Sequence, residues 1–361
     1  MVKESKRVSA LEPYKITPQD VWVSDSSKII KSDWNEAPFT LSVYDEVIKE
    51  SIAHKGLVAW YPDYNATELV KSISAYTGCK MDQILAYGGS DAALCDITNC
   101  FLDDGEKVIL VSPTYDNFRV YVAQNGGESL DFPLNQDGNL NVEKLREFIK
   151  KVDPKIVYIV NPNNPYGTVT DPSSIKTLLE EFDKTLFIID EAYIDFVLSY
   201  SSAKFIAKYK NIIVSRTFSK GFGIAGLRIG YVLAQESIIK ILSKIRKGKD
   251  ITMLGQKCAV HALKNISHIQ NWLREIENSK EKFYKFFEKY GIRFYKSYAN
   301  FILFETADST RLSNYLKSEH IYVRNRDSIL KNHIRITVSS NKLADKIIEI
   351  FEKNIQMLKK I

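Results

Sequence analysis

The stretch that organises this chain is Ser215-Arg216-Thr217-Phe218-Ser219-Lys220-Gly221-Phe222-Gly223, followed by Gly226-Leu227-Arg228. The apolar run just before it, Ile212 to Val214, predicts a strand, and the glycines predict a tight turn after that strand. Because burying an unpaired ammonium is costly, a lysine at such a break indicates a reactive amine. An ordinary surface loop with a solvated lysine is the alternative reading of this stretch alone.

A reactive lysine amine has a well-known chemical partner. Lysine amines form imines with carbonyl compounds, and pyridoxal 5'-phosphate is the common aldehyde that they meet in enzymes. Thr217, Ser219 and Arg228 flank Lys220 in the sequence, and hydroxyls with a guanidinium suit a phosphate group. The stretch therefore predicts a pyridoxal phosphate site with Lys220 as its covalent anchor.

The bulk composition narrows the class of protein. With 361 residues, 45% hydrophobic and 26% charged, the chain is long enough for one large domain and a smaller one. The 50 basic and 44 acidic residues are spread along the sequence, so no nucleic-acid partner is expected. The four cysteines lack paired spacing and the histidines are scattered, which predicts a cytoplasmic protein without a metal site. No apolar run approaches roughly 18–20 residues, so no membrane span is expected.

From residue 84 onward, short apolar runs alternate with helical patterns. Strands are predicted at 84–87, 107–111, 155–160, 186–189, 212–214 and 229–234. Uniformly apolar strands separated by helices predict an α/β fold with a mostly parallel sheet covered on both faces. Ligands of such sheets bind beyond the carboxyl ends of the strands, where this chain places its polar clusters. We expect the site at that edge.

Three parts of the chain are expected. Residues 1–43 form an N-terminal arm, 44–250 a large cofactor-binding domain, and 251–361 a smaller α+β domain. In the last part, strands are predicted over 292–304, 321–324 and 333–338, and a helix over 341–358.

Several single residues suggest chemistry, each with an ordinary structural alternative. Asp190 ends an apolar strand, where a carboxylate is costly without a cationic partner such as a protonated pyridine nitrogen; a carboxylate capping a loop is the alternative. Gly89, Ser90 and Asp91 join a strand to a helix whose start offers N–H groups to an anion. Arg335 lies in an alternating run, which suggests capture of a substrate carboxylate or a structural salt bridge.

Taken together, the clusters resemble fold-type I pyridoxal-phosphate-dependent aminotransferases, specifically the histidinol-phosphate aminotransferase-like branch. The resemblance covers nearly the whole chain. It rests on Pro13-Tyr14, Asn35-Glu36, Tyr61-Pro62-Asp63, Gly89-Ser90-Asp91, Pro113-Thr114-Tyr115, Asn161-Pro162-Asn163-Asn164-Pro165, Asp190-Glu191-Ala192-Tyr193, Ser219-Lys220, Ala225-Gly226-Leu227-Arg228, Ala299-Asn300-Phe301 and Arg335-Ile336-Thr337-Val338.

The resemblance implies a role for each matching residue. Lys220 binds the cofactor and moves the proton, and Asp190 pairs with the ring nitrogen. The remaining ring contacts are Asn164 and Tyr193 at the ring oxygen and Tyr115 stacked on the ring. The phosphate ligands are Gly89, Ser90, Asp91, Thr217, Ser219, Arg228 and, from a second subunit, Tyr61. The substrate ligands are Arg335 and Asn35 for a carboxylate, and Tyr14 and Arg324 for a phosphate.

The implied activity is transfer of an amino group between glutamate and a small phosphorylated carbonyl compound, in a homodimer with shared sites. Histidinol phosphate with imidazole acetol phosphate is one substrate pair, and dihydroxyacetone phosphate is another acceptor. Ala92, Trp60 and Tyr166 depart from the family pattern and are expected near the substrate mouth. The alternatives are a decarboxylase of phosphoserine or phosphothreonine on the same scaffold, and a non-catalytic regulator.

Overall fold

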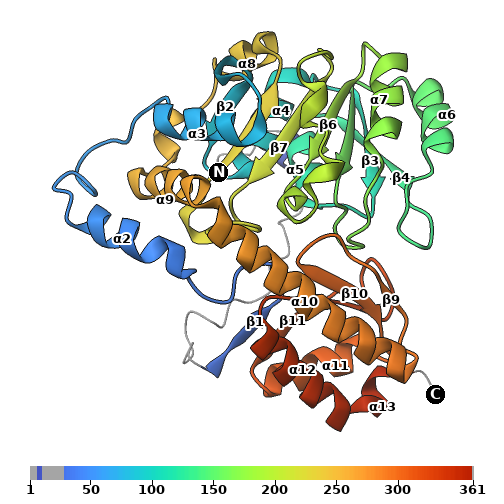
Figure 1. The fold of residues 1–361 in the computed structure, drawn as a ribbon. Coiled ribbons are helices and arrows are strands. Elements are labelled where there is room, and N and C mark those ends of the chain that lie inside the picture. The colour runs from blue at the N-terminus through green and yellow to red at the C-terminus, as the bar shows by residue number, and fades with distance from the viewer. Residues whose placement is uncertain (1–5, 10–27, 360–361) are drawn as a thin grey trace, which may run out of the picture.

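The computed structural model describes residues 6–9 and 28–359, and it places two sheets beside each other (Figure 1). The larger sheet has seven strands in the order β2-β8-β7-β6-β5-β3-β4. Their bounds are β2 Ile84–Tyr87, β3 Lys107–Ser112, β4 Glu128–Pro133, β5 Ile156–Val160, β6 Leu186–Asp190, β7 Ile212–Thr217 and β8 Gly230–Ala234. All neighbours run parallel except β8, which is antiparallel to β2 and β7. The predicted α/β fold with a mostly parallel sheet is therefore confirmed.

Helices cover both faces of this sheet because its strands are apolar on both sides. In β5, Tyr158 and Val160 face one core while Val157 and Ile159 face the other. The helices that pack on the Val157 face are α2 Asp45–Ile52, α3 Thr67–Thr77, α6 Val142–Val152, α7 Pro172–Glu181 and α9 Met253–Lys264. The helices on the Tyr158 face are α4 Ser90–Phe101, α5 Asn117–Gln124 and α8 Glu236–Leu242, and the short α1 Lys6–Ser9 lies beside α5.

The smaller sheet has the order β1-β11-β12-β10-β9. Its strands are β1 Ile30–Ser32, β9 Phe294–Tyr295, β10 Phe301–Glu305, β11 Ile321–Asn325 and β12 His333–Thr337. The helices around it are α11 Ser309–Ser318, α12 Asn341–Lys353 and α13 Ile355–Leu358. β1 comes from the N-terminal arm and pairs in parallel with β11, so the arm is joined to the smaller sheet.

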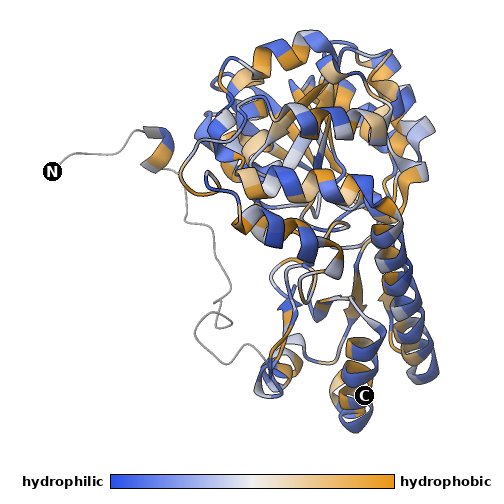
Figure 2. Cartoon of the chain, turned by 60° about the vertical axis from the view of Figure 1, so that its left-hand side comes forward, coloured by the Kyte–Doolittle hydropathy of each residue, from blue (hydrophilic) through white to orange (hydrophobic). Residues whose placement is uncertain are grey.

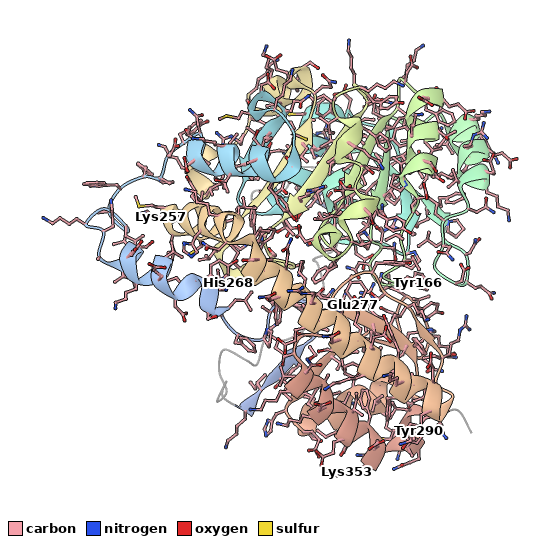
Figure 3. The ribbon with its side chains drawn as sticks, viewed as in Figure 1. Tyr166, Lys257, His268, Glu277, Tyr290 and Lys353 are labelled. Carbon is pink, nitrogen blue, oxygen red and sulfur yellow. The ribbon has the colours of Figure 1, made fainter. Side chains whose placement is uncertain are left out.

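One long helix, α10 (Ile266–Tyr290), connects the two sheets. Ile269, Trp272 and Ile276 pack into the core of the larger sheet, whereas Phe283 and Phe287 pack into the core of the smaller one. The labels from His268 through Glu277 to Tyr290 follow α10 in Figure 3, and the Lys257 label marks the preceding helix α9. Since α9 and the first half of α10 belong to the larger core, we propose a domain boundary inside α10 rather than at residue 250.

The sequence did not predict β4. Its residues Glu128–Pro133 lie at the edge of the sheet, where three are exposed, two are partly buried and only Phe132 is buried. An edge strand has one hydrogen-bonding neighbour, so it does not need the continuous apolar run that marks the inner strands. Figure 2 shows how the whole molecule separates its residues, with hydrophobic colour gathered in the interior and hydrophilic colour along the outward sides of the helices.

Within residues 6–9 and 28–359, no helix combines the length and the hydropathy that crossing a membrane requires.

Candidate active site

A cavity of about 1070 Å³ lies at the carboxyl ends of the large sheet, where its strands meet the N-terminal arm and the smaller sheet. Its described lining residues come from all three parts, and they include Trp34, Ser90, Asp91, Tyr115, Asn164, Asp190, Tyr193, Thr217, Ser219, Lys220, Arg228, Arg324, Arg326 and Arg335. Lys220 and Asp190 therefore open into the same cavity, as a joint role in one reaction requires.

Asp190 ends β6, on the same face of the sheet as Tyr158. The register pairs Val160 with Asp190, which places Tyr158 two residues back on the neighbouring strand. The Tyr158 hydroxyl donates to Asp190 Oδ2 at 2.7 Å, and the Ala192 amide donates to Oδ1 at 3.1 Å. Burial raises the pKa of Asp190 to about 6, although the two hydrogen bonds act in the opposite direction. This carboxylate would be stabilised by a cation inside the cavity.

Lys220 follows β7 and reaches across the cavity. Its Nζ donates to the Trp34 carbonyl oxygen at 2.7 Å, so the lysine contacts the N-terminal arm. Burial lowers the pKa of Lys220 to about 8, with the positive charges of Arg335 and Lys31 acting in the same direction and Glu36 opposing them. The lysine therefore reaches the neutral, nucleophilic form far more readily than a solvated lysine does.

A cradle for an anion forms where β2, β8 and the start of α4 converge. Gly89 has φ +96°, and a Cβ there would come within 2.6 Å of Arg228 Nη2. A Cβ on Gly230 would lie 2.6 Å from the Ser90 amide nitrogen. Glycines at both positions leave room for the backbone N–H groups at the helix start and for the guanidinium, which together suit a phosphate. Thr217 completes this end through its hydrogen bond to Ser219 at 2.8 Å.

Two tyrosines are held in place at the sides of the cavity. The Tyr115 hydroxyl donates to Asp91 Oδ1 at 2.7 Å. The Tyr193 hydroxyl accepts from Asn35 Nδ2 at 3.0 Å, while Asn35 Oδ1 accepts from the Thr337 hydroxyl at 3.0 Å. Because both ends of the Asn35 amide are engaged, this residue orients Tyr193 in the present structure.

Arg335 lies on β12, directly opposite Arg324 on β11. Its Nη1 donates to Asn164 Oδ1 at 2.6 Å and its Nη2 to the Asp33 carbonyl at 2.6 Å. Its Nε is buried and has no hydrogen-bond acceptor among the residues that the structure describes. Burial lowers the pKa of Arg335 to about 10, helped by the nearby charges of Arg326 and Arg324. The guanidinium thus has a hydrogen-bond donor for an anionic ligand, and an anion beside it would stabilise its positive charge.

The structure does not bring every predicted residue to the cavity. Tyr61 is 76% exposed, and its ring lies under the Lys249 ammonium at 4.1 Å. Tyr14 lies outside the described residues. Of the departures from the family pattern, Tyr166 packs against Tyr295 between the two sheets and Trp60 is exposed, so neither lines the cavity. Ala92 packs in the core on the α4 face, so none of the three departures lines the cavity of this single chain. A place at the substrate mouth stays a prediction for Trp60, which precedes Tyr61 in the sequence.

Sequence reasoning missed four residues of the site: Tyr158, Trp34, Lys31 and Arg326. Tyr158 lies inside an apolar strand. It is two residues before Val160, the residue paired with Asp190, so its side chain is on the same face of the sheet as Asp190, and this spacing was the signal that could have revealed it. Trp34 contributes a main-chain carbonyl, for which side-chain patterns carry no signal. Arg326 lies just past the end of β11, two residues after Arg324, and this spacing was the signal that could have revealed it, because side chains two apart in an extended chain point the same way.

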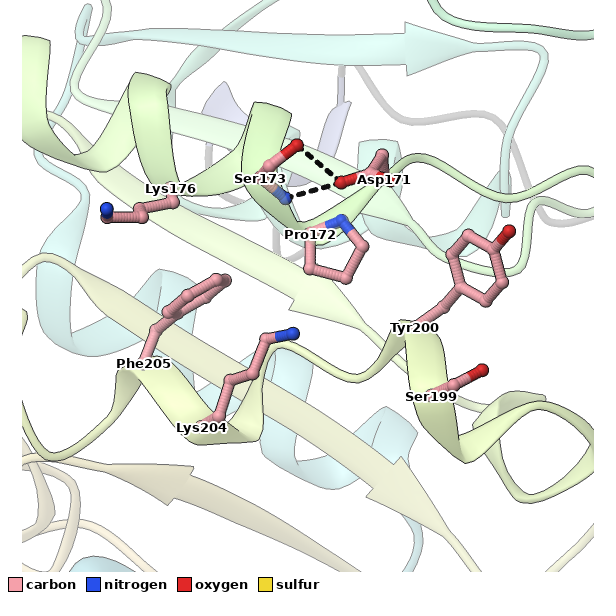
Figure 4. A pocket seen from close by; sticks show the side chains of 8 residues that line it. All are labelled: Asp171, Pro172, Ser173, Lys176, Ser199, Tyr200, Lys204 and Phe205. Atoms are coloured by element: carbon pink, nitrogen blue, oxygen red, sulfur yellow. Dashed lines mark hydrogen bonds between the residues drawn. The ribbon is translucent and has the colours of Figure 1, made fainter.

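A second hollow, of about 500 Å³, lies beside the start of α7 and is lined by Lys176, Tyr200 and Lys204 among others (Figure 4). The carboxylate of Asp171 accepts from the Ser173 amide at 2.7 Å and so caps the helix. The Ser173 amide at the helix start is therefore already engaged by a side chain of the same chain. Across the part of the chain that the structure describes, no cluster of three or more His, Cys, Asp or Glu residues is placed to hold a metal ion.

The comparison with protein families shows which family of enzymes the chain belongs to. The model of "Aminotransferase class I and II" matches residues 29–351. The chain belongs to this family. A dihydroxyacetone phosphate transaminase of Campylobacter jejuni is 34% identical over 98% of both chains. A histidinol-phosphate aminotransferase of Caldanaerobacter subterraneus is 34% identical over 88% of this aminotransferase and 91% of its own length.

Solved structures agree with the fold of this aminotransferase. The histidinol-phosphate aminotransferase of Sinorhizobium meliloti, solved in complex with pyridoxal-5'-phosphate, superposes with a TM-score of 0.88 over 99% of this chain and 98% of its own, at 22% identity. The L-threonine-O-3-phosphate decarboxylase of Porphyromonas gingivalis has a TM-score of 0.76 at 20% identity, covering 91% of this chain and all of its own. The predictions of fold type I and of an aminotransferase are thus confirmed.

The residues of this aminotransferase fit pyridoxal phosphate. One cavity holds an amine with a lowered pKa, a buried carboxylate whose hydrogen bonds come from neutral groups, and a glycine-lined anion cradle. These three features match the aldehyde, the ring nitrogen and the phosphate of the cofactor.

Proposed function

We propose that this aminotransferase transfers an amino group between glutamate and a small phosphorylated carbonyl compound. Dihydroxyacetone phosphate is the first acceptor to test, because the relative that acts on it is similar along the full length of both chains. Imidazole acetol phosphate, the partner of histidinol phosphate, is the second. The observation that carries the proposal is the common cavity of Lys220, Asp190 and Arg335.

Lys220 performs the proton transfer in this proposal. When bound, pyridoxal phosphate supplies an electron-withdrawing ring that stabilises negative charge at the substrate Cα. The Lys220 amine would hold the cofactor and, once its amine is free, would take up the Cα proton of the substrate as a neutral base. Its lowered pKa, about 8, favours that role because a general base works best near the ambient pH.

Asp190 holds the proton on the ring nitrogen. A buried carboxylate whose pKa burial raises to about 6 gains strongly from a cationic partner, and the hydrogen bonds from Tyr158 and Ala192 keep it aimed. Asn164 and Tyr193 would hold the ring oxygen, and Tyr115 would lie against the ring. The phosphate contacts come from the cradle of Gly89, Ser90, Asp91, Thr217, Ser219 and Arg228.

Arg335 binds the carboxylate of the amino donor. A planar guanidinium with a buried, unused Nε–H matches the two oxygens of a carboxylate. The Asn164 contact fixes Arg335 beside the proposed ring site, so donor binding and ring binding are coupled through one hydrogen bond. Asn35 contributes by orienting Tyr193, because its side-chain amide donates a hydrogen bond to the Tyr193 hydroxyl.

The functional unit in this proposal is a homodimer. The connection between α2 and α3 projects from the body of the molecule (Figure 1), and its apolar side chains are exposed, with Val58 at 96% and Trp60 at 65%. Such a group of exposed apolar residues favours a protein interface. Tyr61 lies in the same connection, is 76% exposed and does not line the cavity of its own chain, so it is available to the phosphate cradle of a second subunit.

Absorbance of the bound cofactor tests the reaction in two halves. Glutamate should change the spectrum, and dihydroxyacetone phosphate or imidazole acetol phosphate should restore it. Lys220→Ala should lose the spectrum of covalently held cofactor together with turnover. If phosphoserine or phosphothreonine released carbon dioxide while glutamate left the spectrum unchanged, the enzyme would be a decarboxylase instead.

A further inference from the structure

A cluster of buried charges lies behind the cavity, on the opposite face of the large sheet from Asp190. Its members are Glu191, Arg216 and Asp195, which are 1%, 4% and 7% exposed. None of the three lines the cavity, although Glu191 directly follows Asp190 and Arg216 directly precedes Thr217. Charged residues are seldom fully buried unless they are paired, so the partners of these side chains matter.

The alternation of side chains along β7 explains why Arg216 points away from the cavity. Ile212 and Val214 pack into the core on one face of the sheet, and Ile213 packs into the core on the other. Arg216 is two residues after Val214 and shares its face, whereas Thr217 takes the other face and lines the cavity. The arginine therefore lies directly behind the strand end that carries the cavity residues.

Arg216 and Glu191 form an ion pair that joins the ends of β7 and β6. Arg216 Nε donates to Glu191 Oε2 at 2.9 Å, and Nη2 lies 2.8 Å from the same oxygen. The Ser201 hydroxyl bridges the two charges, because it accepts from Arg216 Nη2 at 2.6 Å and donates to Glu191 Oε2 at 3.0 Å. The Ser202 amide donates to Glu191 Oε1 at 2.5 Å. Since a buried ion pair adds little stability over an apolar pair, its fixed geometry is the more informative feature.

The same cluster supports the turn that carries Lys220. A Cβ on Gly221 would lie 2.5 Å from the Cβ of Asp195, so the Asp195 side chain packs directly against this turn. The Tyr76 hydroxyl donates to Asp195 Oδ1 at 3.1 Å. Burial raises the pKa of Asp195 to about 6, and the positive charge of Arg216 acts in the opposite direction. The guanidinium therefore stabilises this second carboxylate as well.

We propose that Arg216 is a positioning residue that sets the separation of Asp190 and Lys220 across the cavity. The inference rests on the proposed function and deepens it. Through Glu191, Arg216 holds the end of β6, and through Asp195 it supports the turn after β7. Pyridoxal phosphate would engage the carboxylate and the amine at once, so a loosened strand end would prevent both contacts from forming together.

The test compares the binding of pyridoxal phosphate and pyridoxine 5'-phosphate to the full chain freed of cofactor. Pyridoxine 5'-phosphate has the same ring and phosphate but no aldehyde, so it cannot bond to Lys220. The ratio of the two dissociation constants therefore reports how well the Lys220 amine is placed relative to the rest of the site. For Arg216→Lys, which keeps the charge without the planar fork, we expect the preference for pyridoxal phosphate to fall by roughly 10-fold. Glu191→Gln should lower the same ratio, because it removes the charge that holds the guanidinium.

Turnover of the holoenzyme gives a second readout. In Arg216→Lys, kcat with glutamate should fall by roughly 10-fold while KM for glutamate changes less than about threefold, because the proposed carboxylate ligand Arg335 is not altered. Arg146→Lys is the matched control. Arg146 also joins two elements by an ion pair, with its Nε 2.6 Å from Glu181 Oε2, but it does not line the cavity or contact the cluster.

A general loss of stability would weaken both ligands by the same factor. An unchanged ratio in the folded variants, or a loss confined to KM for glutamate, would therefore overturn the inference. Ser201→Ala removes the bridging hydroxyl but leaves both charges, so it should lower the ratio by a smaller factor and keeps the test decisive if the charge variants do not fold. Failure of the proposed function is a different outcome, since the wild-type protein would then show no preference for pyridoxal phosphate and no response to glutamate.

Discussion

At the scale of single residues, the buried Asp190 carboxylate lowers the unfolding free energy of the cofactor-free protein. Burial raises its pKa to about 6 from an ordinary value of 3.8, so the folded chain holds the proton more tightly than the unfolded chain does. The unfolding free energy of the cofactor-free protein therefore falls as the pH rises from about 4 to about 6, and the loss persists above that window. In the proposed function, the protonated ring nitrogen of the cofactor would remove this loss by supplying a cation.

Asp190→Asn should consequently stabilise the cofactor-free protein at pH 8 by on the order of 2 kcal/mol while abolishing transamination. The asparagine can still accept from the Ala192 amide, and the Tyr158 hydroxyl can reverse its role and accept. Urea unfolding at pH 8 and at pH 4 measures the effect, and the two proteins should be nearly equal at pH 4. A variant less stable than the wild type at pH 8 would contradict this account of Asp190.

Tyr158 supplies the second prediction at this scale. Its hydroxyl lowers the pKa of Asp190 by donating to the ionised carboxylate. Tyr158→Phe removes that donor, so the pKa of Asp190 should rise and the acid limb of kcat/KM should move to higher pH. The pH profile of glutamate turnover measures the shift. An acid limb that stays in place in Tyr158→Phe would mean that Asp190 does not control it.

At the scale of elements, the site depends on how closely β8 approaches the start of α4. A Cβ on Gly230 would lie 2.6 Å from backbone atoms of Gly89 and Ser90, and backbone cannot move aside as a flexible side chain can. Gly230→Ala should therefore weaken cofactor binding by at least about tenfold and destabilise the protein by roughly 1–3 kcal/mol. Gly226→Ala is the matched control, because nothing lies within 4 Å of a Cβ there. Cofactor titration and thermal unfolding of both variants would settle the comparison.

The elements also show what a sequence can reveal before a structure is known. The inner strands β5, β6 and β7 were predictable because they are buried on both faces, and their polar ends indicated Asp190 and Lys220 as partners. The edge strand β4 was not predictable, since half of its residues meet solvent. Contacts made by main-chain atoms, such as the Trp34 carbonyl with Lys220, depend on how distant segments fold together and leave no pattern in the side chains.

At the scale of the whole molecule, the projecting connection between α2 and α3 should determine assembly. Val58→Glu places a charge at the most exposed large apolar residue of this segment, so a dimer formed through it should dissociate. Sedimentation should then report a monomer, and activity should fall because Tyr61 no longer reaches a neighbour. Leu198→Glu, at an exposed apolar position on a different element, is the control. A dimer that survives Val58→Glu with full activity would place the interface elsewhere.

The N-terminal arm links the two sheets at the reacting lysine. β1 is paired with β11 of the smaller sheet, and two residues later the Trp34 carbonyl accepts the Lys220 ammonium. The indole of Trp34, with the Lys31 ammonium 4.7 Å from its ring centroid, therefore lies where any rotation of the smaller sheet changes its surroundings. Trp34 is thus an intrinsic fluorophore at the junction of the two sheets. The emission that differs between wild type and Trp34→Phe would report, without an added dye, any displacement of the smaller sheet relative to Lys220.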